Sequence, residues 1–565
     1  MREASAEIIE EASLWRDDPG DFGMGTAAAA MAAVVVAALF ALPSLYAACL
    51  GADFATLANE SIAYRFGHVH RLATGDPAGI WLPQGYTLSL LQRGLYSLVS
   101  ASVVETDLRS ALNRFALMTA GLSALLVSAL VLMIAKDRWL PRGAKLWICL
   151  VAILPVYGFT TAGVGYALSA DYYQLDVVLI AAAVYLLLAG MARLEVPIDS
   201  LSAAALGAFA GAAAANKISI LPVASLPLIP MALRAWAHAG RPPAILVASG
   251  CGACGAFLLI HASYFSLEWG ELVRALVSWW AFASSSSGEP GFWETSFLQH
   301  AVRYNYRYAA VFFGLALLVS AASAIVWWVR VSAHISGSVP EQRRRIFRWA
   351  ASLLATCGIV GVGLVAAWSL WRRPAGTTFY EIACVAIGLG GALLGLYAHV
   401  PFGRWAGAAL ASGWLLTVGM TFDAAWAHNM LHDSAQRGAL GWSLHEHLKG
   451  FGKPVIVVID DDGFAARSVE KLLLKAFSDF PTWDMSTGRE ELWRLAPLSF
   501  RTRQSSHGPE GPYPHSFVLA EYVRLDLEGT RPISAQLEAL KLRSGVTCER
   551  WILDSFNAVD VCDVP

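Results

Sequence analysis

A carboxylate, Asp53, stands at the start of a long polar segment, residues 51–109, that follows the first strongly apolar run of the chain. A carboxylate in such a position can act as a general base, bind a metal ion or cap the helix that follows it. The length and patterning of the segment, together with its acidic start, favour an enzyme over a simple pore.

The composition predicts an integral membrane protein. Of the 565 residues, 56% are hydrophobic and only 15% are charged, which is far from the composition of a soluble globule. About eleven apolar runs are long enough to cross a membrane as helices. They lie near 25–50, 111–135, 146–167, 175–192, 200–215, 218–235, 244–265, 308–330, 349–370, 380–399 and 405–425. The pair 200–215 and 218–235 can also be read as one kinked helix, because Asn216 and Lys217 interrupt it.

The orientation follows from the basic residues of the short loops, which are enriched on the cytoplasmic side. Two such loops follow even-numbered runs, and they contain Lys136, Arg138, Arg142 and Lys145 in one case and Arg330, Arg343, Arg344, Arg345 and Arg348 in the other. We therefore expect a plasma-membrane (inner-membrane) protein with residues 1–24 in the cytoplasm. Segments 51–109, 168–174, 266–307 and 371–379 and the tail then face outward. The net charge of −2 singles out no partner, and we expect no nucleic acid.

Two domains are predicted, a transmembrane domain over 25–427 and a periplasmic domain over 428–565. In the second, residues 453–460 and 516–526 have strand patterns and 464–478 has the pattern of an amphipathic helix, which predicts a small α/β fold. Cys548 and Cys562 lie in this tail, where an oxidising compartment would allow a disulfide between them. The alternative is a pair of unrelated thiols.

Segment 51–109 contains two amphipathic patterns, over 54–72 and 87–104. In the second, Leu88, Leu91 and Leu95 share one stripe, and Gln92 and Arg93 lie on another. Helices of this kind lie in the membrane interface with their apolar side inward. We expect the two helices to roof a cavity at the outer leaflet.

Several motifs resemble those of the GT-C fold glycosyltransferases. The first is Asp53 at the end of the first apolar run, followed by Arg71-Leu-Ala-Thr-Gly-Asp76 and Trp81-Leu-Pro. Ser169-Ala-Asp-Tyr-Tyr-Gln-Leu-Asp176 and Ala215-Asn-Lys-Ile-Ser-Ile-Leu-Pro222 are similar to later segments of that superfamily. The resemblance covers about the first 235 residues. Many relatives have Asp-Glu where this chain has Asp53-Phe54, so a divalent cation stays an open alternative and no metal ligands are assigned.

The resemblance implies transfer of a sugar from a polyprenyl-phosphate-linked donor to a glycan, lipid or protein acceptor at the outer face of the membrane. The acceptor hydroxyl must lose its proton as it attacks the anomeric carbon, which suits a carboxylate as general base. Asp53 is the candidate for this role, with helix capping as the alternative. The leaving lipid phosphate requires positive charge, which Arg supplies bidentately.

Seven further residues are candidates for substrate binding, and each has a plainer alternative. Cations can bind the donor phosphate or reach membrane lipid head groups, and Asp171 can be a second acidic group or the start of a helix. The set is Asp171, Tyr172, Lys217, Arg303, Arg307, Arg372 and Arg373.

Other polar patterns favour structural roles. His68 and His70 point to different helix faces, Asp460, Asp461 and Asp462 lack the spacing of a calcium loop, and His445-Glu-His447 is typical of a solvated helix start. Two other functions remain as alternatives. One is a transporter or flippase of lipid-linked saccharide, and the other is a non-catalytic membrane subunit whose tail binds a partner.

Overall fold

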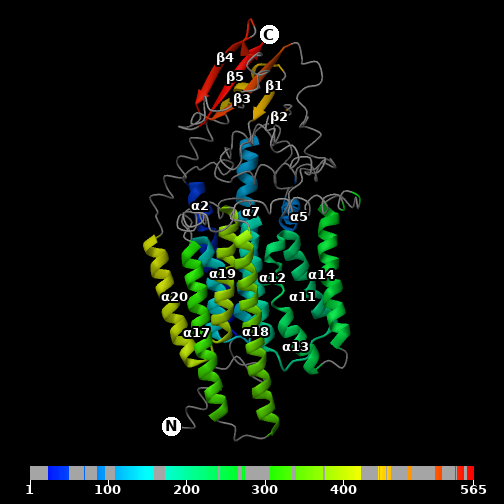
Figure 1. The fold of residues 1–565 in the computed structure, drawn as a ribbon, viewed down its shortest axis with the longest axis vertical. Coiled ribbons are helices and arrows are strands. Elements are labelled where there is room, and N and C mark those ends of the chain that lie inside the picture. Colours follow the sequence, from blue (N-terminus) through cyan, green and yellow to red (C-terminus); the bar gives the residue numbers. More distant parts are fainter. Residues whose placement is uncertain are drawn as a thin grey trace.

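The computed structural model consists of a long helical bundle and a β-sheet beyond one end of it (Figure 1). It describes residues 23–49, 69, 85–95, 108–157, 172–238, 242–264, 270, 273, 306–333, 339–372, 376–421, 443–444, 446–448, 450–453, 455–459, 482–484, 516–524, 541–542, 544–552 and 557–565.

Every predicted apolar run contains at least one helix. The helices are α2 (Thr26–Cys49), α5 (Tyr86–Leu95), α7 (Leu108–Lys136), α8 (Arg142–Tyr157), α10 (Tyr172–Ala192), α11 (Ser200–Asn216), the short η2 (Ile218–Ile220), α12 (Leu221–Ala224), α13 (Leu228–His238), α14 (Pro242–Tyr264), α17 (Tyr306–Ala333), α18 (Val339–Arg372), α19 (Gly376–Leu396) and α20 (Pro401–Thr421). Residues 200–238 thus form separate helices, not one kinked helix.

The described part of the chain has 7 helices that are long and apolar enough to cross a membrane. They lie within α2, α7, α10, η2 to α13, α14, α17 and α18, and α11 and α19 contain shorter apolar helices. Large apolar side chains such as Val35, Leu246, Leu318 and Leu364 are exposed on these helices. Contiguous exposed apolar surface of this kind marks contact with lipid or protein. The structure is therefore that of a helical membrane protein.

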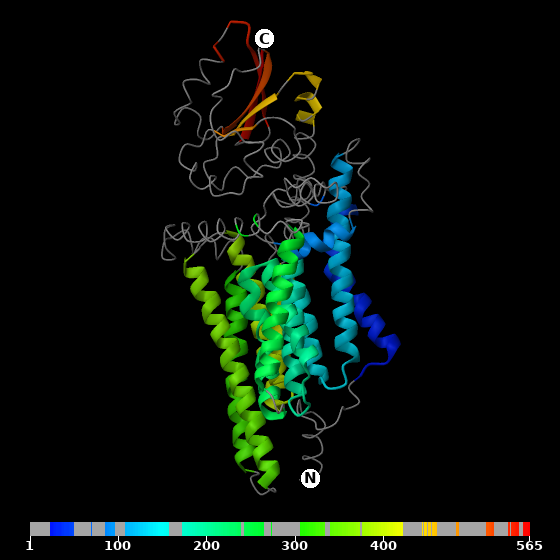
Figure 2. The ribbon, with the colours of Figure 1, turned by 90° about the vertical axis from the view of Figure 1, so that its right-hand side faces the viewer.

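Helices α10 and α19 lie at the centre of the bundle. All side chains from Ile382 to Ala398 in and just after α19 are buried, and they pack against Val151, Ile180 and Phe312 of neighbouring helices. Figure 2 shows α17 and α18 as a hairpin that extends past the end of the bundle opposite the sheet. We call the bundle end that carries α5 and faces the sheet the sheet-side end, and the opposite one the far end (Figures 1 and 2).

At the far end, a buried carboxylate holds neighbouring elements together. The Asp137 side chain, 1% exposed, accepts hydrogen bonds from Arg193 (2.7 Å), the Tyr185 hydroxyl (3.1 Å) and the Trp139 backbone N–H (2.9 Å). These contacts join the α7–α8 loop to the end of α10. Because a buried charge is tolerated only when it is paired and hydrogen-bonded, Asp137 fixes these elements together.

Helices α11 and α14 pack with their backbones in direct contact. A Cβ atom added at Gly207, Gly211 or Gly252 would lie 1.9, 2.2 or 2.1 Å from a carbonyl oxygen of the facing helix. The facing oxygens belong to Ser249, Ala253 and Ala204. Small residues four apart allow this close approach, which is a common way for helices to associate in membranes.

The C-terminal sheet has 5 strands in the order β2-β1-β3-β5-β4. They are β1 (Val455–Ile459), β2 (Thr482–Asp484), β3 (Phe517–Arg524), β4 (Thr547–Ile552) and β5 (Asn557–Val564), and β1 runs parallel to β2 and β3 while β5 runs antiparallel to β3 and β4. The strands predicted over 453–460 and 516–526 are therefore confirmed as β1 and β3. The helix predicted over 464–478 lies outside the described residues.

One face of the sheet is covered by helical residues that precede it. Leu444 and Leu448 pack on Val518, Ala520 and Val559. On the other face, Cys548 of β4 and Cys562 of β5 stand directly opposite one another and form a disulfide, as the sequence predicted. The bond closes a loop with a sequence separation of 14 residues at the end of the chain.

The helix contact gives a matched pair of variants on α14. Gly252→Ala places a methyl group against the Ala204 carbonyl and should destabilise the bundle by about 1–3 kcal/mol or more through overpacking. Gly250→Ala adds the same methyl group two residues away, where nothing lies within 4 Å, and should be neutral or stabilising by at most about 1 kcal/mol. Thermal unfolding of the detergent-purified proteins measures the difference. Equal midpoints for the two variants would show that the backbones are not in contact.

Candidate functional site

Helix α5, in the loop between α2 and α7, lies against α11 and α14 at the sheet-side end. Its first turn is held by hydrogen bonds to the end of α11. The Thr87 hydroxyl donates to the Ala212 carbonyl (2.7 Å), and the Gly85 N–H donates to the Asn216 carbonyl (2.5 Å). Gly85 has a φ of 84°, a conformation that favours glycine. The loop is thereby joined to the transmembrane helices at a defined point.

The Asn216 side chain connects three elements. Its oxygen accepts a hydrogen bond from the Leu88 N–H in the first turn of α5 (3.2 Å), and its nitrogen donates to the Asp176 carboxylate of α10 (2.7 Å). The two partners fix which way the amide points, because an N–H requires an acceptor and a carboxylate requires a donor. Leu88 carries one of the helix-start N–H groups that lack a partner within their own helix.

Two ionisable residues accompany Asn216. Asp176 is 2% exposed and lies four residues into α10, about 6 Å from its start along the helix axis. Lys217 is 6% exposed and has an extended backbone (φ −157°, ψ 122°), which separates α11 from η2. We call Asp176, Asn216 and Lys217, with residues 85–88 at the start of α5, the sheet-side polar group.

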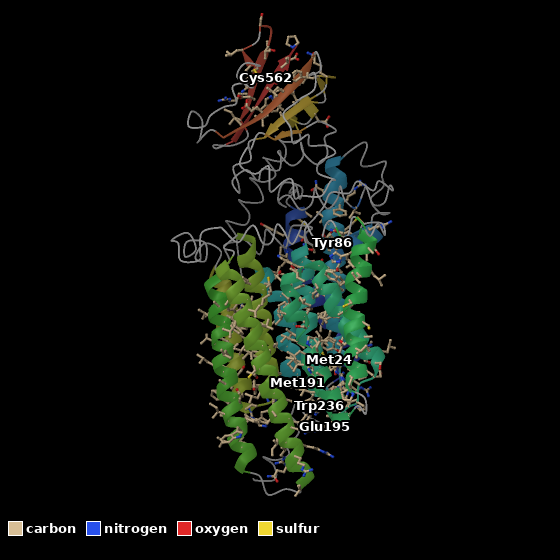
Figure 3. The ribbon with its side chains drawn as sticks, turned by 45° about the vertical axis from the view of Figure 1, so that its right-hand side comes forward. Met24, Tyr86, Met191, Glu195, Trp236 and Cys562 are labelled. Atoms are coloured by element: carbon tan, nitrogen blue, oxygen red, sulfur yellow. A yellow bond between two sulfur atoms is a disulfide. The ribbon has the colours of Figure 1, made fainter. Side chains whose placement is uncertain are left out.

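An aromatic contact fixes the other side of α5. The Tyr86 ring meets the His261 ring of α14 edge-on, with 4.5 Å between centroids, and His261 also packs on Phe257 at 4.1 Å. The His261 Nδ1 lies 2.8 Å from the Phe257 carbonyl. Figure 3 shows Tyr86 at the sheet-side end, far from Met191, Glu195 and Trp236 at the far end. His261 is thus an anchor for Tyr86.

Part of the helix predicted over 87–104 lies in the described residues. It begins with α5, and Leu88 is fully buried while Arg93 is exposed, as the pattern predicted. Gln92, however, was placed on the stripe away from the apolar side, and this was wrong. It is fully buried, and its amide donates to the Thr119 hydroxyl of α7 (3.0 Å), so that the inner side of α5 is partly polar.

The structure brings some of the predicted site residues to one end of the bundle. Lys217 belongs to the sheet-side polar group, and Tyr172 begins α10 four residues before Asp176. Arg307 lies in the first turn of α17 and Arg372 ends α18, both at the sheet-side end (Figure 1). The side chains of Tyr172, Arg307 and Arg372 lie outside the described part. Asp53, Asp171, Arg303 and Arg373 lie outside the described residues.

Four residues of this region are not among the site residues predicted from the sequence, namely Asp176, Asn216, Tyr86 and His261. Two of them carried a signal. Asn216 stands with Lys217 as a polar pair inside an otherwise apolar run, and Asp176 ends the motif that begins at Ser169. Tyr86 and His261 carried none, because an aromatic residue in a loop and a histidine at a helix end are ordinary.

The sheet contains a second cluster of charges, formed by Glu521, Lys541, Arg550 and Asp560. Glu521 faces Asp560 across β3 and β5, and Lys541 pairs with both carboxylates. Arg550 of β4 donates two hydrogen bonds to Asp560 (2.6 and 3.0 Å). Burial, only partly offset by Lys541, raises the pKa of Glu521 above its ordinary value. Burial also acts on Asp560, but the bonds from Arg550 and Lys541 outweigh it and keep that pKa below its ordinary value.

These charges satisfy one another, so the cluster is a structural element of the sheet. His447 also has a structural environment, since it contacts Glu549 and packs on Phe451 and Trp551. Within the described residues, no group of His, Cys, Asp and Glu side chains is arranged to hold a metal ion. His68, His70, His445 and Asp460 to Asp462 lie outside these residues.

Comparison with known proteins assigns no family. No protein-family model matches the chain, and no curated protein matches its sequence. The sheet-side polar group therefore has to be interpreted from its own chemistry.

The charge cluster predicts a pH-dependent effect of Arg550→Gln. The variant removes two bonds to the buried Asp560 carboxylate, which should destabilise the sheet by about 1–3 kcal/mol at pH 7. Because Asp560 has a lowered pKa, its ionised form stabilises the fold fully above the ordinary Asp value, and this contribution is lost as the pH falls through the native pKa. The deficit of the variant should therefore shrink in acid. Hydrogen exchange of peptides from β3, β4 and β5 at several pH values measures it.

Lys453→Gln is the control for this experiment. It removes a half-exposed ion pair with Asp563 in the same sheet, and exposed pairs contribute about 0–1 kcal/mol. An Arg550→Gln effect no larger than that of Lys453→Gln, or one that grows in acid, would contradict the assignment of Asp560 as the buried partner.

Proposed function

We propose that the protein is a membrane glycosyltransferase of the GT-C type. In this proposal it moves a sugar from a polyprenyl-phosphate-linked donor to a glycan, lipid or protein acceptor on the periplasmic face, with Asp53 as general base. The helical membrane architecture agrees with this class of protein. The sequence motifs near Asp53, Asp176 and Asn216 supply the resemblance that suggests this class of enzyme.

The proposed topology has eleven membrane spans, a cytoplasmic N-terminus and a periplasmic tail. The far end carries the basic residues Lys136, Arg142, Arg330 and Arg343, which is the side that the positive-inside rule assigns to the cytoplasm. The tail extends from the opposite end, and its disulfide suits an oxidising compartment.

The observation that carries the proposal is the joining of the first loop to the sheet-side polar group. Asp53 opens the loop that contains α5, and α5 is hydrogen-bonded to Asn216 beside the buried Asp176 and Lys217. A reaction at the membrane surface needs a base for the acceptor hydroxyl and positive charge for the leaving phosphate. The loop supplies Asp53 for the first task. Lys217, Arg303, Arg307, Arg372 and Arg373 are the candidates for the second, with a divalent cation as the alternative.

A transporter or flippase of lipid-linked saccharide is the second candidate. The break from α11 through η2 to α13 favours it, because transporters use interrupted helices at their binding sites. Such sites lie near the middle of the membrane. In the described part of the bundle, the buried charged residues Asp137, Lys145, Asp176 and Lys217 instead lie at helix ends, which favours chemistry at the surface. A non-catalytic subunit with a partner-binding tail is a third reading.

Asp53→Asn tests the enzyme. It removes the base but keeps the size of the side chain, so transfer should fall by about a hundredfold or more, the usual contribution of a general base. The assay follows transfer from polyprenyl-phosphate-linked hexoses and pentoses, supplied one at a time to membranes containing the protein. Mass spectrometry of envelope glycans and glycolipids, with and without the protein, identifies the missing unit.

Asp199→Asn is the matched control. Asp199 caps the start of α11 at the far end, and Asn caps helices equally well, so this variant should keep full transfer. Undiminished transfer by Asp53→Asn would remove Asp53 from the mechanism. Loss of the protein with accumulation of a complete lipid-linked intermediate on the inner face, and no missing glycosyl unit, would identify the flippase instead.

The topology predicts the chemical state of two cysteines. In intact cells, Cys548 and Cys562 should resist alkylation by N-ethylmaleimide, because a periplasmic tail keeps them in a disulfide. Dithiothreitol should make both react, which peptide mass spectrometry detects as two added groups. Alkylation of both cysteines in untreated cells would place the tail in a reducing compartment and overturn the proposed orientation.

A further inference from the structure

We propose that Asn216 is a positioning residue that seats α5 and orients the Asp176 carboxylate at the same time. Only its effect on turnover rests on the proposed glycosyltransferase function; the seating of α5 is a property of the fold.

The start of α5 and the end of α11 cap each other. A helix leaves its last carbonyl groups and its first N–H groups without partners. Here the Asn216 carbonyl at the end of α11 accepts from the Gly85 N–H, and the Asn216 side-chain oxygen accepts from the Leu88 N–H of α5. The Thr87 hydroxyl adds a bond to the Ala212 carbonyl. The positive end of one helix thus meets the negative end of the other, which is favourable.

This arrangement depends on the break after Asn216. Lys217 adopts an extended backbone, so α11 ends at Asn216 and its carbonyl is available to Gly85. The next hydrogen bond of the chain, from the Ile220 N–H to the Lys217 carbonyl, begins the separate turn η2. The polar pair that interrupts the apolar sequence is therefore what creates the docking point for the loop.

The nitrogen of the Asn216 side-chain amide binds Asp176. Its N–H group donates to the carboxylate at 2.7 Å, at a position where Asn216 is fully buried and Asp176 is 2% exposed. A side-chain amide can accept from a backbone N–H through its oxygen and donate to a carboxylate through its nitrogen at the same time. Through Asn216, a displacement of α5 would alter the hydrogen bond that orients Asp176. A change at Asp176 would in turn alter the hydrogen bond that holds the loop beginning at Asp53.

Cysteine labelling measures whether α5 is held in its buried position. Ser89 in α5 is fully buried and Leu90, its neighbour, is 40% exposed. Ser89→Cys and Leu90→Cys are made separately in a chain that keeps Cys384, Cys548 and Cys562 and has alanine at the other five free cysteines. The detergent-purified proteins are labelled with a sulfonated maleimide. With Asn216 present, Cys at 90 should react and Cys at 89 should be protected.

Asn216→Leu removes both hydrogen bonds of the side chain at similar volume. Labelling of Cys at 89 should then become about tenfold faster, since the Leu88 N–H of α5 loses its side-chain acceptor and a buried donor without an acceptor shifts the opening equilibrium by about that factor. Labelling of Cys at 90 should stay constant. Cys384 lies buried in α19 and should stay unlabelled, which distinguishes release of α5 from unfolding of the bundle. Unchanged protection of position 89 would overturn the proposal.

The exchange of partners tests the coupling to Asp176. In Asp176→Asn combined with Asn216→Asp, the amide at 176 donates to the carboxylate at 216, which also accepts from the Leu88 N–H. Protection of position 89 should return to within about threefold of the parent. Failure of this rescue would show that the Asp176 bond does not hold α5.

Turnover is measured separately on the same variants. If sugar transfer is found, it should fall by about tenfold or more in Asn216→Leu and recover in part in the exchanged variant. If no transfer is found with any donor, the proposed function fails while the labelling result stands. Normal transfer by Asn216→Leu with a released α5 would overturn the positioning role.

Discussion

The close contact between α11 and α14 is the constraint on which the sheet-side end depends. In a membrane, apolar residues give helices little reason to associate, so contact relies on packing and on backbones that approach closely. Gly207, Gly211 and Gly252 leave no room for a side chain between these two helices. The contact fixes the end of α11, with Asn216, relative to the end of α14, with His261. Helix α5 contacts both helices, through the Asn216 hydrogen bond to α11 and through the Tyr86–His261 ring contact to α14. Its position therefore depends on how α11 and α14 pack against each other.

The polar residues of the bundle work at its two ends in different ways. At the far end, the Asp137 carboxylate accepts hydrogen bonds from Arg193, Tyr185 and a backbone N–H, which indicates a structural role for this ion pair. At the sheet-side end, Asp176 and Lys217 are buried beside a loop helix that is held by a few hydrogen bonds. Helix α10 joins the two ends, since it carries Asp176 near its start and Tyr185 further along. The bundle therefore has one end closed by a buried ion pair and one end closed by a loop helix.

Much of the helical architecture could be predicted from the sequence, because hydrophobic runs in a membrane protein have few alternatives to helix. Strands β1 and β3 and the disulfide were equally predictable, from short apolar runs rich in β-branched and aromatic residues at Val455–Ile459 and Phe517–Arg524 and from two cysteines in a polar tail. The sequence does not predict which helix packs against a given glycine-bearing helix face. The spacing of Gly207 and Gly211 is a signal for such a contact, but it does not say which helix lies opposite. The burial of Gln92 could not be predicted either, because its hydrogen-bond partner Thr119 lies on another helix.

The position of α5 illustrates why a site of this kind escapes sequence patterns. A helix of 10 residues is marginal by itself, so its stability has to come from tertiary contacts. Apolar burial supplies part of this through Leu88, but the defined register comes from end-to-end capping with α11. Capping bonds between helices far apart in sequence leave no periodic trace, and only the polar pair Asn216-Lys217 marks the place. Because such bonds are few and each is modest, we expect α5 to open more readily than the long helices of the bundle.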